Sequence, residues 1–435
     1  MPTEKNNTDA RITSESPAQA RIVTACRVCG NTTLDHVLSL GEQYISDFVD
    51  EMTENASAPL ELVICNASEN GCGLLQLKHT ADQPALYRNY WYRSGINQTM
   101  RDALADITEK ASKLANLQSG DFIIDTGSND NTLLKSYKVP NVHRIGFEPA
   151  TNLMPYAQDP EITVINDFFS AQPFLEKSNG AKAKIMTSIA MFYDLEDPNK
   201  FTADAASCIA KDGLWIIQMA YLPSMLLDNI FDNICHEHLE YYSLLSLENL
   251  LSRHGLKIID VELNDVNGGS YRTYITHADN TSVVPFEGAA GRIEGLRNQE
   301  KTMELDTLTP YLDFAKEVET IKEKVTSFIK KEVENGKTVY VYGASTKGNT
   351  LLQYFGLDHN IITAAAERNP DKWGKKTVGT LIPIVSEEDA RAAKPDYFLV
   401  LPWHFLPEFK NREQDYLTSG GKFIVPLPRF EIVEG

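Results

Sequence analysis

The stretch 121–150 constrains the fold of this 435-residue chain more than any other. An apolar run ends in Asp125-Thr-Gly127, and a second apolar run ends in Glu148. The order strand, glycine turn, helix, strand and acidic residue is typical of a nucleotide-binding half-unit. The N–H groups of such a turn favour an anionic group, and a carboxylate about 20 residues further on can accept both ribose hydroxyls. The stretch therefore predicts an α/β fold and an adenosine-containing ligand.

The glycine spacing separates two kinds of cofactor. A dinucleotide site requires G-x-G-x-x-G, and Gly127 does not begin that pattern. The form acid-x-Gly resembles motif I of class I S-adenosylmethionine (SAM) methyltransferases, with Asn129 and Asn131 in place of the later glycines. Asparagine tolerates positive φ better than other non-glycine residues, so the turn is expected to survive. An ordinary strand-turn-helix of another α/β domain is the alternative.

Composition excludes several partners. The net charge of −19 and the pI of about 5.0 argue against nucleic acid, which needs clustered Lys and Arg. No stretch approaches the roughly 18 apolar residues of a membrane span. The acidic segment 1–20 lacks the apolar core of a signal peptide, so it is interpreted as a disordered tail of a cytoplasmic protein. Six cysteines in such a chain indicate reduced thiols or a metal site.

Four of these cysteines lie near the start of the chain, as Cys26-x-x-Cys29 followed by Cys65 and Cys72. A Cys-x-x-Cys pair and a second pair can complete a tetrahedral zinc site. Four sulfur ligands leave no open position, so this zinc is expected to stabilise the fold and not to do chemistry. Free thiols are the alternative.

Further apolar runs predict the remaining elements of the first α/β unit. The strands are expected at 162–165, 184–189, 214–218, 256–263 and 271–275, and the helices at 198–208 and 246–254. A long amphipathic helix is predicted over 297–334, with a break allowed at Pro310. It is interpreted as a connector between two units, and an oligomer-forming helix is the alternative.

Two segments between these elements carry candidate chemistry. The aromatic stretch 86–107 contains Tyr90 and Tyr92, and it is compatible either with core packing or with a lid over a ligand. The run His236-Glu237-His238 offers an imidazole beside a carboxylate, which is a candidate general base near neutral pH. A metal pair without an evident third ligand and a structural His-Glu pair are the alternatives.

A second α/β unit is predicted from residue 339 onwards. Its first strand ends in Gly343-Ala-Ser-Thr-Lys-Gly348, an anion-binding type of turn. Asn349 stands where a Walker A motif needs its lysine, so a P-loop is rejected. Further strands are expected at 361–366, ending at Glu367, and at 397–401.

Taken together, the motifs CRVCG, YWYRSG, DTGSNDNTLL, GFEPA, NDFF, FDNICHEHLEYYSL, NGGSYRTYI and GASTKGNTLLQYF resemble the SAM-dependent NDP-sugar C-methyltransferases of deoxysugar biosynthesis. The resemblance implies an α/β chain with a zinc-binding module, a Rossmann-like class I methyltransferase domain and a second Rossmann-like domain. The implied divisions are a tail at 1–20, a zinc-binding domain at 21–80, a SAM-binding domain at 81–295, a connecting helix at 296–335 and a C-terminal domain at 336–435.

The resemblance also implies roles for individual residues. SAM is assigned to Ser94, Asp125, Gly127, Asn129, Glu148, Pro149, Asp167, Phe168 and Ile189. Catalysis is assigned to His238 as the base, with Glu237, His236, Tyr90 and Tyr92. The sugar nucleotide is assigned to Tyr242, Asn267, Gly268, Arg272, Ser345, Lys347, Asn349 and His404. Structural Zn²⁺ is assigned to the four cysteines. Relatives often have Tyr at the position of Cys235 and His at the position of Asn267.

The implied reaction is transfer of a methyl group to the carbon beside the ketone of a 4-keto-deoxy, dTDP-linked sugar, after His238 forms an enolate. Tyr90, Tyr92 or the turn 267–269 are the candidates for holding the enolate oxygen. The expected partner is the NDP-sugar, without nucleic acid or membrane, in a monomer or weak homodimer. O-methylation or methylation of another small or glycan acceptor, a NAD-dependent oxidoreductase and a non-catalytic zinc protein are the rival hypotheses.

Overall fold

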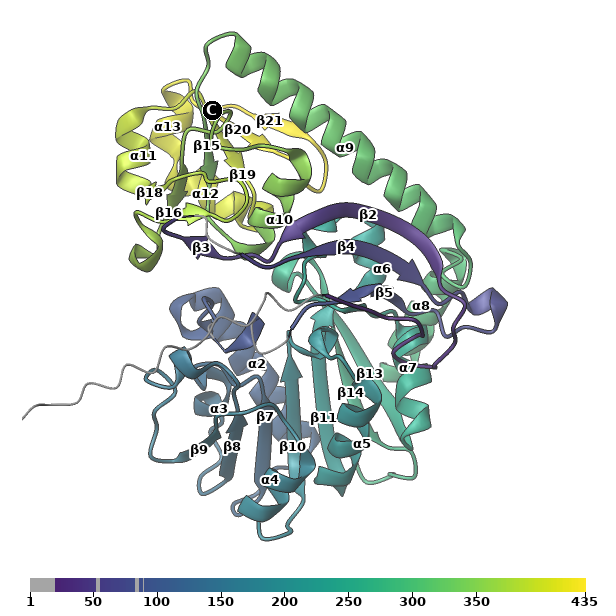
Figure 1. Cartoon of the computed structure of the whole chain (residues 1–435). Coiled ribbons are helices and arrows are strands. Elements are labelled where there is room, and N and C mark those ends of the chain that lie inside the picture. Colours follow the sequence, from purple (N-terminus) through teal and green to yellow (C-terminus); the bar gives the residue numbers. More distant parts are fainter. Residues whose placement is uncertain (1–19, 52–54, 83–85, 89) are drawn as a thin grey trace, which may run out of the picture.

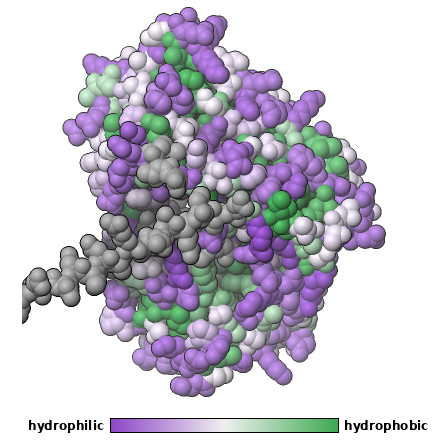
Figure 2. All heavy atoms as spheres, in the orientation of Figure 1, coloured by the Kyte–Doolittle hydropathy of each residue, from purple (hydrophilic) through white to green (hydrophobic). Residues whose placement is uncertain are grey.

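The computed structural model describes residues 20–51, 55–82, 86–88 and 90–435. A cysteine-containing N-terminal segment lies between two α/β units, and a long helix runs along one side of the molecule (Figure 1). This architecture confirms the predicted α/β class with two Rossmann-like units. None of the described helices is both long and apolar enough to cross a membrane. The face in Figure 2 is mostly hydrophilic, with hydrophobic residues in small patches.

The middle unit is built on a sheet with the order β13-β14-β11-β10-β7-β8-β9, which has seven strands in the described part of the chain. Its strands are β7 (Phe122–Thr126), β8 (His143–Phe147), β9 (Ile162–Ile165), β10 (Ala183–Ile189), β11 (Ile209–Ala220), β13 (Leu256–Asn264) and β14 (Ser270–His277). The strands from β7 to β11 are parallel, while β14 runs antiparallel to both of its neighbours. All predicted strands of this unit are confirmed, although β11 begins at Ile209, before the predicted start at residue 214.

Short helices connect these strands and cover the sheet. They are α2 (Gln98–Leu114), α3 (Thr132–Ser136), α4 (Ala171–Lys177), α5 (Pro198–Cys208), α6 (Leu222–Leu227) and α7 (Leu244–Arg253). The parallel strands all point their carboxyl ends to one edge of the sheet, where ligands of open α/β sheets bind.

The N-terminal segment forms a sheet that it does not complete by itself. Its strands β2 (Asp35–Tyr44), β4 (Ser57–Ile64) and β5 (Leu75–Leu77) are joined by β12 (Glu240–Tyr241) from the middle unit. In addition, β3 (Phe48–Val49) pairs with β17 (Lys376–Thr377) of the C-terminal unit, and β1 (Arg21–Ile22) pairs with β6 (His79–Thr80). The segment is therefore hydrogen-bonded to both α/β units.

The C-terminal unit has a sheet with the order β18-β16-β15-β19-β20-β21. Its strands are β15 (Val339–Tyr342), β16 (Ala365–Glu367), β18 (Ile384–Ser386), β19 (Tyr397–Val400), β20 (Lys422–Val425) and β21 (Glu431–Val433), and its helices are α10 (Thr346–Phe355), α11 (Glu387–Ala393), α12 (Leu406–Arg412) and α13 (Gln414–Thr418). The strand expected at 361–366 was predicted too early. Ile361 and Ile362 instead close a turn on the carbonyl of Asp358, so pairing begins at Ala365.

The predicted helix over 297–334 is two helices, α8 (Ala289–Thr302) and α9 (Thr309–Glu334). Pro310 lies in the first turn of α9, where a missing N–H removes no helical hydrogen bond. The buried face of α9 joins one hydrophobic core with the N-terminal sheet and the C-terminal unit. The prediction of a connector packed on both neighbours agrees with this core.

Candidate active site

The turn after β7 has the conformation that the motif requires. Gly127, Asn129 and Asn131 have positive φ values of 69°, 54° and 63°. The prediction that asparagines replace the later glycines of this turn is therefore confirmed. Gly127 also brings the backbone close to Met191, because an added Cβ would lie 3.3 Å from that side chain.

Glu148 at the end of β8 braces this turn. Its Oε2 accepts a hydrogen bond from the Asn129 N–H at 2.7 Å, and its Oε1 accepts one from the Ala150 N–H at 2.8 Å. Burial raises the pKa of Glu148, while the two N–H groups oppose the rise. The carboxylate lines a cavity directly beside the turn, as a ribose-binding residue requires.

Asp125 lies below the turn and is buried. Its Oδ1 accepts a hydrogen bond of 2.6 Å from the Thr187 hydroxyl. Burial raises the pKa of Asp125 to about 7, although the Thr187 hydrogen bond opposes this rise.

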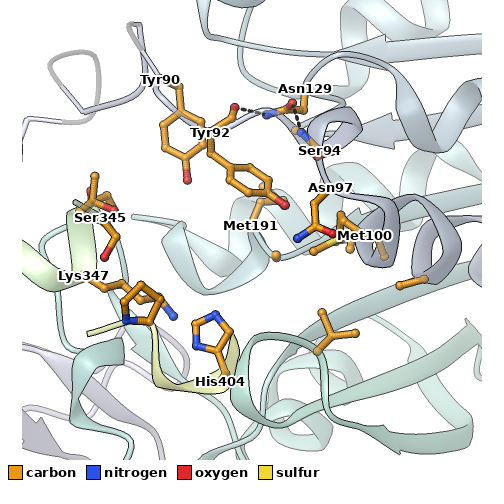
Figure 3. A pocket seen from close by; sticks show the side chains of 18 of the residues that line it. Tyr90, Tyr92, Ser94, Asn97, Met100, Asn129, Met191, Ser345, Lys347 and His404 are labelled. Carbon is orange, nitrogen blue, oxygen red and sulfur yellow. Dashed lines mark hydrogen bonds between the residues drawn. The ribbon is translucent and has the colours of Figure 1, made fainter. Parts of the chain in front are cut away.

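The aromatic stretch is fastened to the same turn by side-chain hydrogen bonds. The Asn129 Oδ1 accepts from the Ser94 N–H at 3.0 Å, and its Nδ2 donates to the Tyr92 carbonyl at 3.1 Å (Figure 3). Tyr90 and Tyr92 line the cavity, and Tyr92 remains 46% exposed. Tyr90 and Tyr92 thus form part of the cavity wall, while Trp91 of the same stretch packs against the hydrophobic core.

A single cavity of about 850 Å³ extends from this turn to the C-terminal unit. Figure 3 shows Ser345, Lys347 and His404 on the side opposite Tyr90 and Tyr92. The predicted site residues that line the cavity are Tyr90, Tyr92, Ser94, Asp125, Gly127, Asn129, Glu148, Pro149, Phe168, Ile189, Glu237, His238, Ser345, Lys347 and His404. Most of the predicted SAM residues thus meet three of the predicted sugar-nucleotide residues in one space.

The remaining predicted residues lie elsewhere. The His236 Nε2–H donates to the carbonyl of Ala58 at 2.9 Å and so holds strand β4. Since a carbonyl can only accept, this imidazole nitrogen carries a proton and serves the fold. Asp167 lies outside the lining and pairs at 3.0 Å with Arg88, which also lies over the Phe168 ring.

Four sugar-nucleotide candidates are also outside the lining as described. Tyr242 is fully buried in the core of the middle unit, and Arg272 on β14 pairs with Asp106 of α2 at 2.8 Å. Asn349 is buried and donates to the Asp47 carbonyl at 2.9 Å, which ties α10 to the N-terminal segment. An added Cβ at Gly268 would lie 3.0 Å from Trp403. The side chain of Asn267 lies outside what the structure describes.

Like His404, His238 lines the cavity. Its Nδ1 lies 2.7 Å from the Asn233 carbonyl, and its ring contacts Tyr193 at a centroid distance of 4.4 Å. The carbonyl can only accept, so Nδ1 carries the proton and Nε2 keeps a lone pair. Burial, assisted by the positive charge of Lys347, lowers the pKa of His238 to about 3. His238 is therefore neutral at pH 7 and has the tautomer that a general base needs.

The turn after β15 repeats the arrangement of the first turn. Glu367 at the end of β16 accepts from the Ala344 N–H through Oε2 at 3.0 Å and from the Arg368 N–H through Oε1 at 2.8 Å. Ser345 caps α10 by accepting from the Gly348 N–H at 2.9 Å. Both units thus present a carboxylate-braced turn to the same cavity.

Lys347 connects this second turn to the histidine segment. Its Nζ donates to the Asn233 Oδ1, while the Asn233 carbonyl holds His238. Its positive charge also lies near the carboxyl of Asp194 and near His404, whose pKa burial and Lys347 lower to about 4. Lys347 therefore places a cation at the junction of the two units.

Sequence reasoning missed several residues of the cavity wall. They include Tyr87, Tyr193, Asp194, Asp232, Cys235, Arg368 and Lys372. Asp194 carried a usable signal, because it lies just beyond the carboxyl end of the fourth strand. Tyr87 lies in the aromatic stretch 86–107 and Arg368 directly follows Glu367, but tertiary packing decides which residues of these segments face the cavity.

The four cysteines form one cluster, as the spacing predicts. Their sulfur atoms all lie within 4.8 Å of one another, and the Cys26–Cys72 and Cys29–Cys65 sulfur atoms are 3.4 Å apart. Gly30 and Gly73 follow two of them with a φ of 77° each, as tight turns around a metal require. Four thiol sulfurs at this spacing fit tetrahedral zinc with no open position.

Three family descriptions match consecutive parts of the chain. They are "Putative zinc binding domain" over residues 26–87, "Methyltransferase domain" over 96–261 and "C-methyltransferase C-terminal domain" over 265–428. A curated relative, the C-methyltransferase NovU of Streptomyces niveus, is 30% identical over 418 residues, which cover 95% of this chain and 97% of the relative.

Solved structures give weaker likenesses. A SAM-dependent methyltransferase of Clostridium acetobutylicum is 10% identical with a TM-score of 0.32, over 41% of this chain and 92% of that chain. The magnesium protoporphyrin IX methyltransferase of Synechocystis is 14% identical with a TM-score of 0.32, over 42% of this chain and 88% of that chain.

Proposed function

Because this chain belongs to the family of SAM-dependent C-methyltransferases, with its zinc-binding, methyltransferase and C-terminal domains, we propose that it methylates the carbon beside the ketone of a 4-keto-deoxy NDP-sugar. A dTDP-linked sugar is the specific expectation. Residues 81–295 hold SAM in this proposal, and residues 336–435 hold the nucleotide of the sugar. SAM supplies an electrophilic methyl group on a sulfonium, which is a good leaving group.

The observation that carries the proposal is the pair of carboxylate-braced turns on one cavity. Glu148 and Glu367 occupy equivalent places after the second strand of each unit, and each accepts backbone N–H groups of its turn. A methyltransferase with a small alcohol substrate needs one such turn, for SAM. A second turn of this kind supports a second nucleotide, and the cavity of about 850 Å³ lies within the usual range for ligand pockets.

His238 supports the proposal that the methyl group goes to carbon. Methylation of carbon requires removal of a proton from that carbon, and the ketone beside it acidifies the C–H bond. The neutral ring, held through Nδ1 by the Asn233 carbonyl, has a free lone pair on Nε2 for this proton. A bound diphosphate brings negative charge into the cavity, which raises the pKa of His238 from its low value.

The chain's other contribution is orientation. The Tyr92 carbonyl accepts a hydrogen bond from Asn129 in the turn after β7, and the Tyr90 N–H donates to Asn152 beyond β8. Both tyrosines face Lys347 and His404 across the cavity (Figure 3). Holding the acceptor carbon in line with the methyl group accounts for a large share of the rate of such a transfer. We assign this positioning to the two facing walls.

The test is a methylation assay with isotopically labelled SAM and a panel of 4-keto sugar nucleotides, with the matching 4-hydroxy sugars as controls. Mass spectrometry should find one added methyl group on a keto sugar, and NMR should place it on carbon next to the ketone. Methylation of a 4-hydroxy sugar on oxygen would replace the proposal by O-methylation. Absence of transfer to every sugar nucleotide would redirect the search to another acceptor.

A further inference from the structure

Two carboxyl groups meet in the wall of the cavity close to His238. Asp194 lies at the carboxyl end of β10 and is half-buried, and Glu237 directly precedes His238. Glu237 is 8% exposed, and its Oε2 has no hydrogen-bond partner among the described residues. Tyr193, whose ring packs on His238, is the chain neighbour of Asp194. Both carboxyl groups therefore line the same cavity as His238.

The position of Tyr87 favours a proton on Asp194. The Tyr87 hydroxyl donates to the Glu237 carbonyl at 2.9 Å, and Tyr87 also lies near enough to Asp194 to affect the pKa of that carboxyl. A phenol has one proton to give. Because that proton serves the Glu237 carbonyl, the phenol oxygen presents lone pairs to its other neighbours, which favours the protonated form of Asp194.

The electrostatic surroundings act in the same direction. Burial, followed by the nearby carboxyls of Glu237 and Glu240, raises the pKa of Asp194 well above its usual range. Tyr87 and Lys347 oppose the rise. Two neighbouring carboxyl groups with little water cannot both ionise at low cost. The surroundings of Asp194 thus favour its protonated form, which can give a proton.

We propose that Asp194 is a further catalytic residue, which gives its proton to the ketone oxygen of the acceptor while His238 removes the proton from the neighbouring carbon. The inference rests on the proposed function. The C–H electron pair becomes the C=C bond of the enol, and the carbonyl π electrons form the new O–H bond. When the methyl group reaches carbon, the C–S electron pair stays on sulfur. The C=O bond then re-forms, and the O–H proton returns to Asp194.

The proposed role can be distinguished from a purely electrostatic effect with Glu240. This carboxyl in strand β12 also raises the pKa of Asp194, but it does not line the cavity. It therefore provides a matched buried carboxyl that influences the local field without touching the substrate. A neutral acid at the ketone oxygen also removes the need for a full negative charge on that oxygen, which is the expensive part of enolate formation in a buried site.

The experiment measures enolisation without methyl transfer. The full-length protein is saturated with S-adenosylhomocysteine and mixed in deuterated water with dTDP-4-keto-6-deoxyglucose, and NMR follows loss of the proton beside the ketone. Asp194→Ala should lower the exchange rate by about 10²–10³-fold, the usual effect of losing one donor at a developing oxyanion. Asp194→Asn keeps a donor but has no acidic proton, so its exchange rate should fall, but by less than that of Asp194→Ala. Affinity for SAM should stay unchanged in both variants.

Several outcomes decide the matter. An Asp194→Ala variant that exchanges at the wild-type rate overturns the role of Asp194. An equal loss in Glu240→Gln overturns it as well, because a change in local field then explains the effect. If Asp194→Ala does not fold, Asp194→Asn decides, and a wild-type rate in that variant rejects the proposal. Absence of exchange in the wild-type protein, while NMR shows that the sugar nucleotide is bound, would instead disprove the enolisation on which the proposed function depends.

Discussion

Glu148 and Glu367 show how one side chain can serve both the fold and a ligand. Each carboxylate accepts N–H groups of its own turn and still lines the cavity. The lone pairs that remain are available to ribose hydroxyls, since a carboxylate has about four acceptor sites. The two residues therefore provide a matched pair for assigning the two nucleotides.

Replacing Glu148 by Ala should weaken SAM binding by about 1.5–3 kcal/mol, because hydrogen bonds to a charged acceptor are lost. Glu367→Ala disturbs its own turn in the same way but should leave SAM affinity nearly intact and raise the Kd for the sugar nucleotide. Isothermal titration of both variants with SAM and with dTDP checks the assignment. Equal losses of SAM affinity in the two variants would contradict it.

Asp125 makes stability depend on pH. Its pKa is raised from 3.8 to about 7 by burial, so ionisation opposes folding and the wild-type protein loses stability as pH rises through about 7. Asp125→Asn keeps an acceptor for Thr187 without the charge. The variant should gain on the order of a few kcal/mol over wild type at pH 8 and much less at pH 5. Urea unfolding of the SAM-free proteins at both pH values measures this, and a pH-independent difference would argue against it.

At the scale of single residues, the sequence predicts those side chains whose role depends on neighbours close in the chain. Gly127, Asn129 and Glu148 were identifiable because strand, turn and strand follow one another within thirty residues. Arg272 and Tyr242 were assigned to the substrate because their neighbours in the chain carry motifs. Their side chains instead complete an ion pair and a core, since the alternation of a strand and the packing of a loop decide which way they point.

Strand β8 requires a glycine at position 146, because the turn after β7 packs closely against it. An added Cβ at Gly146 would lie 2.6 Å from the Ser128 Oγ and 3.0 Å from the Asn131 Oδ1, both in the SAM turn. Gly295 lies on the exposed side of α8, with nothing within 4 Å of an added Cβ. Gly146 thus allows the turn after β7 to pack closely on β8, whereas Gly295 in α8 has no packing role.

Gly146→Ala should destabilise the protein by about 1–3 kcal/mol through overpacking, and it should weaken SAM binding because the turn must move. Gly295→Ala should stabilise by about 0.5–1 kcal/mol, since alanine favours the helix. Denaturant unfolding together with SAM titration tests both changes. A Gly146→Ala variant with unchanged SAM affinity would show that the turn absorbs the extra methyl group elsewhere.

The larger elements were predictable because their hydrophobic runs are long and periodic. The seven strands of the middle unit and the buried stripe of α9 follow this rule. Strand β12 could not be predicted in this way, because a strand of two residues carries no periodic signal and its partner β5 lies far away in the chain. The pairing of β3 with β17 was hidden for the same reason.

At the scale of the molecule, the zinc cluster belongs to the core of the middle unit. Cys26, Cys65 and Cys72 share one hydrophobic cluster with Ile124 and Phe147 of the central sheet. Loss of the metal leaves thiols crowded in that core, so its effect should reach the whole methyltransferase unit and not a separate module.

Metal analysis should find about one zinc per chain, by the four-thiolate stoichiometry. Removal of zinc with a chelator should lower the melting temperature and also reduce SAM binding, while Cys65→Ser should lower the yield of folded protein more than the turnover of what folds. Differential scanning calorimetry and titration of the chelated protein provide the measurement. Metal-free protein with a normal melting temperature would remove the structural role of zinc.

The four-stranded sheet completed by β12 has a consequence for how the protein is made. The ribosome releases β2, β4 and β5 early, but the strand that covers the edge of β5 is synthesised on the order of ten seconds later, at typical elongation rates. During this interval the nascent chain exposes an unpaired edge, which invites pairing with other chains. Zinc bound by the four early cysteines would hold this segment folded until β12 is made. Zinc-starved cells should therefore accumulate this enzyme as aggregates during translation and not as a full-length, inactive form.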